Sequence, residues 1–419
     1  MSFDRISMIG LGYIGLPTAA LFAARGVPVT GVDVSQRVVD TINAGKIHIV
    51  EPELDGIVHK AVTEGWLRAS TTPEASDAFI IAVPTPFKAD HEPDLSYIEA
   101  AAKAVAPVLK AGDLVVLEST SPVGATEKMS VWMAEARPDL SFPQTAGEEA
   151  DVQVAHCPER VLPGQVVREL VENDRVIGGM TARASRMAVE LYQIVVRGDC
   201  VVTDARTAEM CKLVENASRD VSIAFANELS VLCDGFDIDV RELISLANRH
   251  PRVNILQPSA GVGGHCIAVD PWFLIASAPE QARLIRQARE VNDDKPKWVL
   301  DKGRDAILET LSAAPGRTMS DITVACLGLA FKPDIDDLRE SPALAITRDF
   351  GRLGCRVLAV EPHIEELPGD FDGLPVALTP LDKALETADI VIVLVKHTAF
   401  RSLREAIPEG RTLIDVVGI

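Results

Sequence analysis

The segment Gly261–Asp270 has the composition of a covalent catalytic site. Cys266 comes just after three glycines, whose amides can approach a ligand closely and donate hydrogen bonds to it. A thiolate adds readily to an aldehyde, and the resulting thiohemiacetal can be oxidised to a thioester. Asp270 would share a face with Cys266 if a helix begins there, and would then act as a base or orient water. The alternatives are an inert core thiol and a carboxylate in the first turn of a helix.

A second set of polar residues precedes this segment. Glu209, Lys212, Asn216 and Arg219 are spaced by three or four residues, so they are predicted to lie on one face of a helix. The ammonium of Lys212 would stabilise the alkoxide and oxyanion that form during oxidation of an alcohol through a thioester. Taken alone, such a stripe is more typical of a solvated helix face.

A glycine-rich turn near the N-terminus indicates a dinucleotide site. Gly10, Gly12 and Gly15 follow an apolar segment and precede an Ala- and Leu-rich helix pattern. In that context the first glycine makes a tight turn, the second admits a pyrophosphate, and the third lets helix and strand pack closely. The anion would bind the amides at the helix N-terminus. The alternative is a tight turn without a ligand.

Asp33 lies eighteen residues after Gly15, at the end of the next apolar segment. A carboxylate at this position can accept hydrogen bonds from the adenosine ribose, and it would repel a 2′-phosphate. We therefore expect NAD as the cofactor rather than NADP.

Apolar runs of strand length alternate with helical patterns in two parts of the chain, as in parallel sheets covered by helices on both faces. The chain is thus predicted to be α/β, with two Rossmann-like doubly wound domains joined by a central all-helical domain. The predicted domains are residues 1–204, 205–302 and 303–419, with a hinge near Ala313–Asp321. The predicted strands are Arg5–Gly10, Val29–Asp33, Ala78–Val83, Leu114–Thr120, Val152–His156, Val176–Gly178, Ile322–Gly328, Arg356–Glu361, Asp389–Val395 and Thr412–Val416.

Composition excludes several functional classes. The 41 Lys and Arg residues against 61 Asp and Glu give a net charge of −20, which disfavours nucleic-acid binding. No apolar run reaches the ~18 residues of a membrane span, and the N-terminus lacks a secretory signal, so we expect a cytoplasmic protein. The 7 cysteines show no disulfide or zinc spacing, and no metal is expected.

Seven motifs, in order, resemble the nucleotide-sugar 6-dehydrogenase family over essentially the whole chain. Within that family, Asn248–Asn254 and GVGGHCIAVDPW resemble the bacterial branch that acts on UDP-N-acetyl-D-mannosamine, because UDP-glucose dehydrogenases more usually carry Ser before the cysteine. The motifs are Gly10–Gly15, Pro84–Pro86, Glu118–Gly124 (ESTSPVG), Cys157–Arg160, Glu209–Asn216 (EMCKLVEN), Gly261–Asp270 and Phe331–Pro342 (FKPDIDDLRESP).

The resemblance implies a four-electron oxidation of a primary alcohol to a carboxylate with two NAD per sugar, in a homodimer formed through the central helices. It also implies that residues 1–204 bind NAD, that residues 205–302 serve catalysis and dimerisation, and that residues 303–419 bind UDP. In such enzymes the loop His250–Arg252 can complete the neighbour's site, and the product supplies a surface polysaccharide such as enterobacterial common antigen. The implied catalytic residues are Cys266 as nucleophile, Lys212 as oxyanion-stabilising or acid–base residue, Asp270 and Glu159 for proton transfer and water attack, and Asn216 and Thr120 as support.

The resemblance also implies binding residues. Four basic members of the substrate set, Arg160, Arg219, Arg252 and Lys332, would give an acidic chain the local positive charge that a pyrophosphate requires. The cofactor set is Gly10, Gly12, Tyr13, Ile14, Gly15, Asp33, Thr85, Thr126 and Arg339. The substrate set is Arg160, Val161, Lys212, Asn216, Arg219, His250, Arg252, Gly263, Phe331 and Lys332.

Other functions stay open at this stage. UDP-glucose or UDP-N-acetylglucosamine would suit the same chemistry, because the configuration of one hydroxyl leaves no trace in composition. A single-step β-hydroxyacid dehydrogenase also combines such a cofactor domain with a lysine-bearing helical domain, but it needs no cysteine loop. From a different class, a nucleotide-binding regulator would keep the fold without the chemistry.

Overall fold

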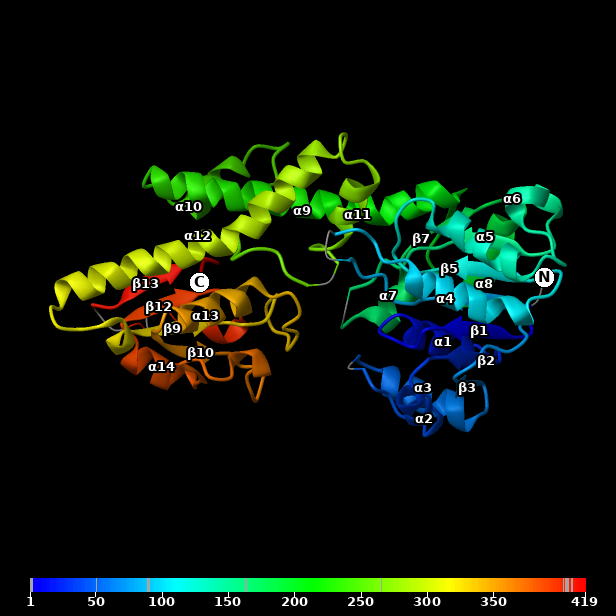
Figure 1. Cartoon of the computed structure of the whole chain (residues 1–419), viewed down its shortest axis with the longest axis horizontal. Coiled ribbons are helices and arrows are strands. Elements are labelled where there is room, and N and C mark those ends of the chain that lie inside the picture. The colour runs from blue at the N-terminus through cyan, green and yellow to red at the C-terminus, as the bar shows by residue number, and fades with distance from the viewer. Residues whose placement is uncertain are drawn as a thin grey trace. The chain divides into compact units, whose positions relative to one another are not determined.

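A computed structural model describes residues 3–49, 51–88, 91–162, 164–264, 266–401, 403, 407 and 410–419 (Figure 1). The chain divides into two compact units, residues 1–215 and 216–419. The boundary falls within the long helix α9 (Ala205–Gly235). Within the described residues, no helix is both long and apolar enough to cross a bilayer.

The first unit is built on an eight-stranded sheet in the order β3-β2-β1-β4-β5-β6-β7-β8. Neighbouring strands are parallel except β6 and β7, which pair antiparallel. The strands are β1 (Ile6–Ile9), β2 (Val29–Val32), β3 (Leu67–Ser70), β4 (Ala78–Ile81), β5 (Leu114–Leu117), β6 (Gln153–His156), β7 (Arg175–Gly179) and β8 (Cys200–Asp204).

Helices cover both faces of this sheet (Figure 1). Along β4 and β5, Ile80 and Val116 pack in one apolar cluster, whereas Phe79 and Val115 pack in another. Such two-sided burial explains why these strands read as continuous apolar runs. One face carries α1 (Gly15–Ala24), α2 (Gln36–Asn43), α3 (Leu54–Thr63), α7 (Val166–Glu172) and α8 (Ala182–Tyr192). The other carries α4 (Ser96–Val105) and α5 (Ala125–Ala136), followed by the short α6 (Pro143–Ala146).

The second unit begins with helices. Besides the rest of α9, these are α10 (Val240–Ala247), α11 (Asp270–Ser277) and α12 (Arg283–Ala313). A buried polar seam joins α9 to α12: Asp220 Oδ1 accepts from Arg289 Nη1 at 2.6 Å and from Asn292 Nδ2 at 2.8 Å. Because each buried polar atom in this seam needs its particular partner, the seam fixes the register of the two helices.

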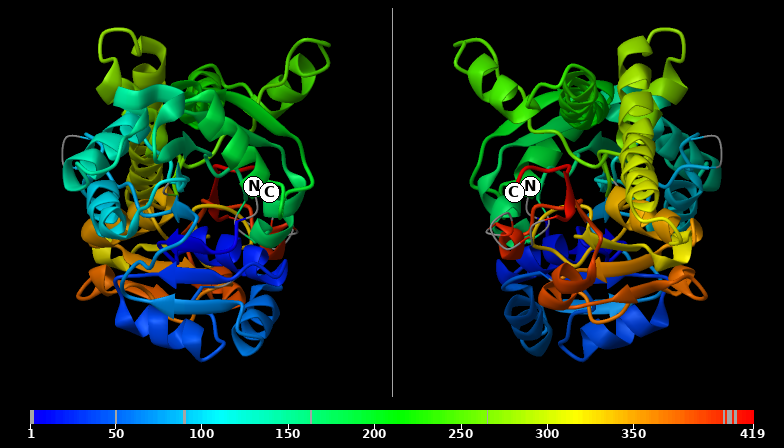
Figure 2. Two further views of the ribbon diagram at one scale, coloured as in Figure 1. Left: turned by 90° about the vertical axis from the view of Figure 1, so that its right-hand side faces the viewer. Right: turned by 90° about the vertical axis from the view of Figure 1, so that its left-hand side faces the viewer.

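A five-stranded parallel sheet in the order β11-β10-β9-β12-β13 completes the second unit. One face packs against α12 and α13 and the other against α14, and the yellow α12 is seen along the orange-to-red sheet in Figures 1 and 2. The elements are β9 (Thr323–Leu327), α13 (Pro342–Arg352), β10 (Arg356–Val360), β11 (Val376–Leu378), α14 (Leu381–Thr387), β12 (Ile390–Val393) and β13 (Thr412–Asp415).

The predicted fold class is confirmed: one mostly parallel and one wholly parallel α/β sheet come before and after a helical region in the chain. The prediction missed β3, β8 and β11, and each of these is an edge strand of its sheet. Val201 and Val202 in β8 are 52% and 56% exposed. These three strands are covered on fewer sides and carry no long apolar run, whereas the edge strand β13 was predicted as Thr412–Val416.

Candidate active site

The glycine turn after β1 has the geometry of a dinucleotide cradle. Gly10 has φ +92°, and a Cβ there would lie 2.4 Å from the Ala82 carbonyl oxygen. A Cβ on Gly15 would lie 1.8 Å from the carbonyl oxygen of Gly10, so the start of α1 packs directly on the turn. A Cβ on Gly12 would meet nothing within 4 Å. Two glycines thus permit packing and the third leaves open space for a ligand.

Asp33 lies directly beside this turn. Its Oδ2 accepts from the Leu11 amide at 3.1 Å, and its Oδ1 accepts from the Ser35 amide at 2.9 Å. Each carboxylate oxygen has a further lone pair, so the group can still accept from ribose hydroxyls. Two further predicted cofactor residues lie within the turn. Tyr13 is 44% exposed, and Ile14 is the N-cap of α1.

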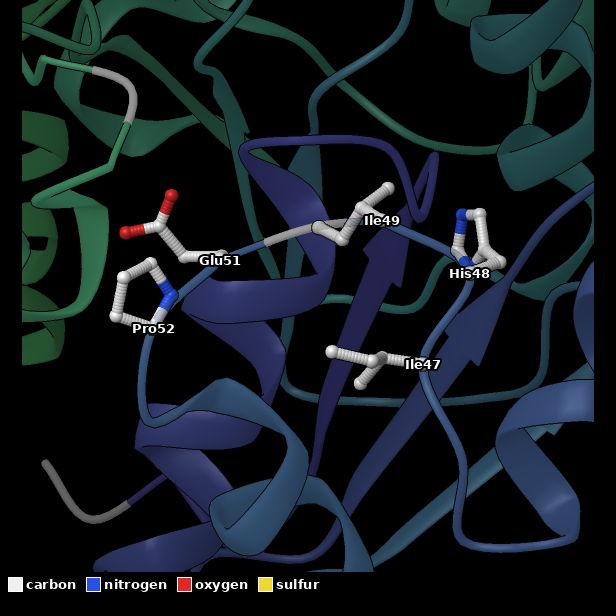
Figure 3. A pocket seen from close by; sticks show the side chains of 5 residues that line it. All are labelled: Ile47, His48, Ile49, Glu51 and Pro52. Carbon is white, nitrogen blue, oxygen red and sulfur yellow. The ribbon is translucent and has the colours of Figure 1, made fainter. Parts of the chain in front are cut away.

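A pocket of about 590 Å³ is lined by Ile47, His48, Ile49, Glu51 and Pro52 (Figure 3). Burial lowers the pKa of His48, while the nearby Asp33 charge and a hydrogen bond with the Leu11 backbone oppose that shift. The pocket therefore borders the glycine turn. Sequence reasoning missed these residues, because an irregular segment carries no periodic signal.

Two predicted residues meet where β4 and β5 end. Thr85 Oγ1 donates to the Thr120 carbonyl oxygen at 2.5 Å. Ser119 Oγ donates to the Val83 carbonyl oxygen at 2.7 Å, which ties the same two segments together. A predicted cofactor residue and a predicted catalytic residue thus share the carboxyl edge of the sheet, where ligands of open α/β sheets bind.

Thr126 is wholly buried on α5, where its hydroxyl and amide bond one carboxylate and the hydroxyl also lies 3.3 Å from His156 Nδ1. Its hydroxyl donates to Glu209 Oε1 at 2.6 Å and its amide donates to the same oxygen at 2.7 Å. Glu209 Oε2 accepts from the Gly124 amide at 2.6 Å. Glu209, which lies in the predicted polar stripe, therefore caps the N-terminus of α5.

Glu159 and Lys212 come together in the first unit. Glu159 is buried; burial raises its pKa, and the charges of Lys212 and Arg175 oppose that shift. The adjacent Arg160 pairs with Glu215 at 2.7 Å, and Val161 is half-buried. A buried carboxyl beside an ammonium is a combination suited to proton transfer.

In the second unit, Cys266 is exposed and lies in the turn before α11. The helix begins at Asp270 rather than at the cysteine, so the expected shared helix face is replaced by a turn in which the Asp270 amide donates to the Cys266 carbonyl oxygen at 2.8 Å. Asp270 itself is buried, and its Oδ2 accepts from Asn216 Nδ2 at 2.5 Å. Three predicted catalytic residues are thus brought together.

The glycine loop before Cys266 packs on the segment that follows β9. A Cβ on Gly263 would lie 2.7 Å from Phe331 Cβ, and the Gly264 amide donates to the Arg339 carbonyl oxygen at 3.2 Å. Arg339 pairs with Asp337 at 2.6 Å, and Lys332 is half-buried. The structure thereby brings the Gly263–Gly264 turn against Phe331 and Arg339, which lie more distant in sequence.

The remaining predicted substrate residues are on the surface of the second unit. Arg219, His250 and Arg252 are exposed, and His250 Nδ1 accepts from the Arg252 amide at 3.4 Å. Asn248 closes the loop from both sides, because its Nδ2 donates to the Ile255 carbonyl oxygen at 2.9 Å and its Oδ1 accepts from the Ile255 amide at 2.7 Å.

Three family models match successive parts of the chain. They describe the NAD binding domain, the central domain and the UDP binding domain of the UDP-glucose/GDP-mannose dehydrogenase family, at residues 4–196, 206–294 and 325–419. Together with the glycine turn, they define the protein as an NAD-dependent dehydrogenase. The chain belongs to the UDP-glucose/GDP-mannose dehydrogenase family.

Individual relatives agree with this family. UDP-N-acetyl-D-mannosamine dehydrogenase from Salmonella typhi is 61% identical, with 100% of each chain covered. NDP-N-acetyl-D-galactosaminuronic acid dehydrogenase from Ralstonia solanacearum is also 61% identical, covering 100% of this chain and 97% of that one. The solved structure of UDP-D-ManNAc dehydrogenase from Pyrococcus horikoshii is 39% identical, with a TM-score of 0.85, covering 99% of this chain and 95% of that one.

Proposed function

We propose that this chain oxidises UDP-N-acetyl-D-mannosamine to UDP-N-acetyl-D-mannosaminuronate and reduces two NAD per sugar. The observation that carries the two-step mechanism is the exposed Cys266 in the turn that leads to the buried Asp270, which accepts a hydrogen bond from the half-buried Asn216. The full-length identity of 61% to a UDP-N-acetyl-D-mannosamine dehydrogenase supports the choice of sugar. Cytoplasmic NAD and UDP-sugar pools would make the cytoplasm its place of action.

The first unit provides the groups that would hold NAD. The open space at Gly12 admits the pyrophosphate, Asp33 accepts from the adenosine ribose, and Thr85 lies at the sheet edge beyond it. The bound cofactor supplies a hydride acceptor for each oxidation. The proposed cofactor-binding set also includes Tyr13, Ile14, Thr126 and Arg339.

The protein groups account for the remaining chemistry. The Cys266 thiolate adds to the C6 aldehyde, oxidation of the thiohemiacetal gives a thioester, and water then releases the carboxylate. Lys212 stabilises the alkoxide and the oxyanion, and Glu159 and Asp270 accept protons, with Thr120 and Asn216 as support. In sum, one alcohol, one water and two NAD⁺ give one carboxylate, two NADH and three protons.

The UDP group would bind the basic and loop residues of the substrate set. Gly263, Phe331 and Lys332 are joined in the second unit, whose last part matches a UDP binding domain. Arginine side chains suit a pyrophosphate because the guanidinium donates two parallel hydrogen bonds. The substrate set proposed here is Arg160, Val161, Lys212, Asn216, Arg219, His250, Arg252, Gly263, Phe331 and Lys332.

Two measurements test the proposal. The first is NADH formed per UDP-sugar carboxylate: we expect two, whereas one would favour a single-step dehydrogenase and none, despite tight UDP-sugar binding, would favour a regulator. The second compares kcat/KM for UDP-N-acetylmannosamine, UDP-N-acetylglucosamine, UDP-N-acetylgalactosamine and UDP-glucose. We expect the highest value for the first sugar. A higher value for the galacto sugar would instead align the chain with its Ralstonia relative.

We also propose a homodimer formed through the central helices. Phe225 and Leu232 are exposed at 54% and 48%, and their spacing of seven residues places them on one face of α9. Phe236, which is 71% exposed, follows directly after the end of α9. Ile238 and Leu246 extend this apolar surface toward and onto α10. A second copy of this chain would cover this surface, because an isologous contact pairs the same apolar stripe of two identical chains.

A further inference from the structure

A group of buried polar side chains surrounds Glu118, which directly follows β5 in the first unit. Arg175 begins β7 and Tyr192 ends α8, elements labelled in Figure 1. Glu118, Arg175 and Tyr192 are 1%, 3% and 0% exposed. Tyr192 Oη donates to Glu118 Oε1 at 3.3 Å, and Arg175 Nη1 lies 3.6 Å from the same oxygen. Arg175 also lies over the Tyr192 ring, 5.4 Å from its centroid.

The same group reaches Glu159. The charge of Glu159 acts on Glu118, and the charge of Arg175 acts on both carboxyls. Within the described residues, Glu118 Oε2, Glu159 Oε1, and Arg175 Nε and Nη1 are buried without a hydrogen-bond partner. The Arg175 guanidinium thus pairs with Glu118 and its charge also acts on Glu159, and in the described part of the chain each of the two carboxyls keeps one buried oxygen without a hydrogen-bond partner.

Two carboxylates that share a buried site cannot both ionise without cost. Burial raises the pKa of Glu118 to about 7, Arg175 opposes this shift, Glu159 adds to it, and the Tyr192 hydrogen bond opposes it. Burial therefore keeps the Glu118 carboxyl protonated to a higher pH than an exposed glutamate. The protonation state of one carboxyl therefore changes the electrostatic interaction between Arg175 and the other carboxyl.

The other titratable groups around Glu118 do not replace it in this role. Burial raises the pKa of Cys157, which follows β6, to about 12, and burial also raises the pKa of Cys200 in β8. Burial raises the pKa of Tyr192 well above its usual range. Lys212 on α9 acts on Glu159.

We propose that Glu118 is a positioning residue for Glu159. When Glu118 is ionised, its negative charge offsets the positive charge of Arg175, so Glu159 is a stronger base. When Glu118 is protonated, the Arg175 charge acts on Glu159 without that offset, so Glu159 is a weaker base. The proposal rests on the proposed role of Glu159 in proton transfer. No proton passes from Glu118 to the substrate in this scheme.

The kinetic test compares the wild type with Glu118→Gln, which keeps the size of the side chain but cannot ionise. We expect the ratio of wild-type kcat to variant kcat to rise with pH through neutrality. Taking a ratio cancels titrations common to both enzymes, such as that of Cys266. A merely structural role would lower kcat by a constant factor, so a ratio independent of pH would overturn the proposal.

Tyr192→Phe is the matched variant, because it keeps the ring and removes the hydroxyl that donates to Glu118; the same hydroxyl also has a hydrogen bond with Cys157. Loss of that bond disfavours the ionised carboxylate, so the neutral-pH titration in kcat should move upward by about one pH unit. Movement to lower pH, or none at all, would contradict the assignment. Thermal unfolding of both variants establishes that they are folded at the assay temperature.

An infrared pH titration of the enzyme without substrate tests the coupling independently of catalysis. We expect a buried carboxyl band that titrates near pH 7 in the wild type and is absent in Glu118→Gln. Glu159→Gln removes a neighbouring negative charge, so this band should titrate at lower pH in that variant. If the band titrates at the same pH in Glu159→Gln as in the wild type, Glu118 and Glu159 are not coupled, and the proposal about Glu118 is wrong whatever reaction the enzyme catalyses. If the band responds but the wild type makes no second NADH, the proposed function fails alone.

Discussion

At the scale of single residues, the setting of Cys266 agrees with the role proposed for it. The thiol is exposed, whereas Cys157, Cys233, Cys326 and Cys355 are buried. A nucleophile must be reachable by its substrate, and a buried thiol in apolar surroundings is held in its unreactive protonated form. Accessibility thus distinguishes one cysteine among the 7 of the chain.

Replacing Cys266 tests that role. Cys266→Ser should lower kcat for carboxylate formation by roughly a thousandfold, because a serine hydroxyl is a far weaker nucleophile at neutral pH. The measurement is carboxylate and NADH per minute, with mass spectrometry for a trapped ester. Cys211→Ser, a half-buried thiol on α9, is the control and should keep wild-type activity. Unchanged turnover to acid in Cys266→Ser would remove the nucleophile assignment.

Two glycines of the same turn should respond differently to alanine. Gly12→Ala has room for its methyl group, so the fold should persist while KM for NAD rises about tenfold, a loss of ~1.4 kcal/mol in binding. Gly15→Ala places a methyl group 1.8 Å from the Gly10 carbonyl oxygen and should lower the thermal midpoint instead. Steady-state kinetics and thermal unfolding separate the two effects. An unchanged KM in Gly12→Ala would place the pyrophosphate elsewhere.

At the scale of elements, carboxylates recur at helix N-termini and connect distant segments. Glu51 accepts from the amides of Gly164 and Val166 at 2.9 and 2.7 Å at the start of α7. Glu209 likewise accepts hydrogen bonds from the amides of Gly124 and Thr126 at the start of α5. These contacts satisfy amides that the helix itself leaves unpaired, and they place the segments next to the site.

Lys295 on α12 should make stability depend on pH. It is 3% exposed and donates to Ser230 Oγ at 2.6 Å; burial lowers its pKa to about 7, and Asp234 opposes the shift. The folded-state pKa is below the unfolded value of 10.5, so the unfolded chain binds more protons between the two values. The cost of burying Lys295 is therefore greatest below pH 7 and disappears as pH rises above 10.5.

Lys295→Met is the variant that isolates this effect. It should raise the urea midpoint at pH 7, by an amount equivalent to ~1–3 kcal/mol, because a buried charge is replaced by an apolar side chain of similar length. The gain over the wild type should shrink between pH 7 and 10. A gain that is the same at both pH values would show that Lys295 is not the titrating group.

The two sheets carry comparable carboxylates that are engaged differently. Asp33 after β2 accepts from two amides, whereas Glu361 after β10 accepts from the amides of Leu329, Ala330 and His363 and is paired with His397 Nε2 at 3.0 Å. Glu361 is buried, so it has little capacity left for a ribose.

The expected consequence is one NAD site per chain. Calorimetric titration of the substrate-free enzyme should give one NAD bound per chain, and UDP should not compete for it. Asp33→Ala should weaken this binding, while Glu361→Gln should lower stability and leave NAD affinity unchanged. Two NAD per chain would contradict the distinction between the sheets.

At the scale of the whole molecule, the apolar stripe on α9 predicts the oligomeric state. Leu232→Glu places a charge in the proposed contact, so the dimer should dissociate and analytical ultracentrifugation should detect monomers. Leu308→Glu is the control: Leu308 is 56% exposed on α12, outside the stripe, and the dimer should persist. A Leu232→Glu variant that remains dimeric would place the interface on another surface.

How far the sequence predicts this protein depends on the kind of feature. The fold class was predictable because runs such as Ala78–Val83 reflect burial on both faces of a strand, a local property of the chain. The edge strands β3, β8 and β11 were not, because their partial exposure removes that signal. The pocket at Ile47–Pro52 also left no pattern, since its residues follow no helical or strand period.

The amino-acid order by itself determined the glycine turn, the carboxylate that follows the next strand, the thiol after three glycines and the alternation of elements, since each depends on neighbouring residues or on periodic burial. Only the tertiary structure decided which polar groups meet: Asn216 with Asp270, Thr85 with Thr120, and Glu118 with Arg175 and Tyr192. The physical reason is that these partners come from distant parts of the chain, and the burial that shifts their proton affinities exists only after folding.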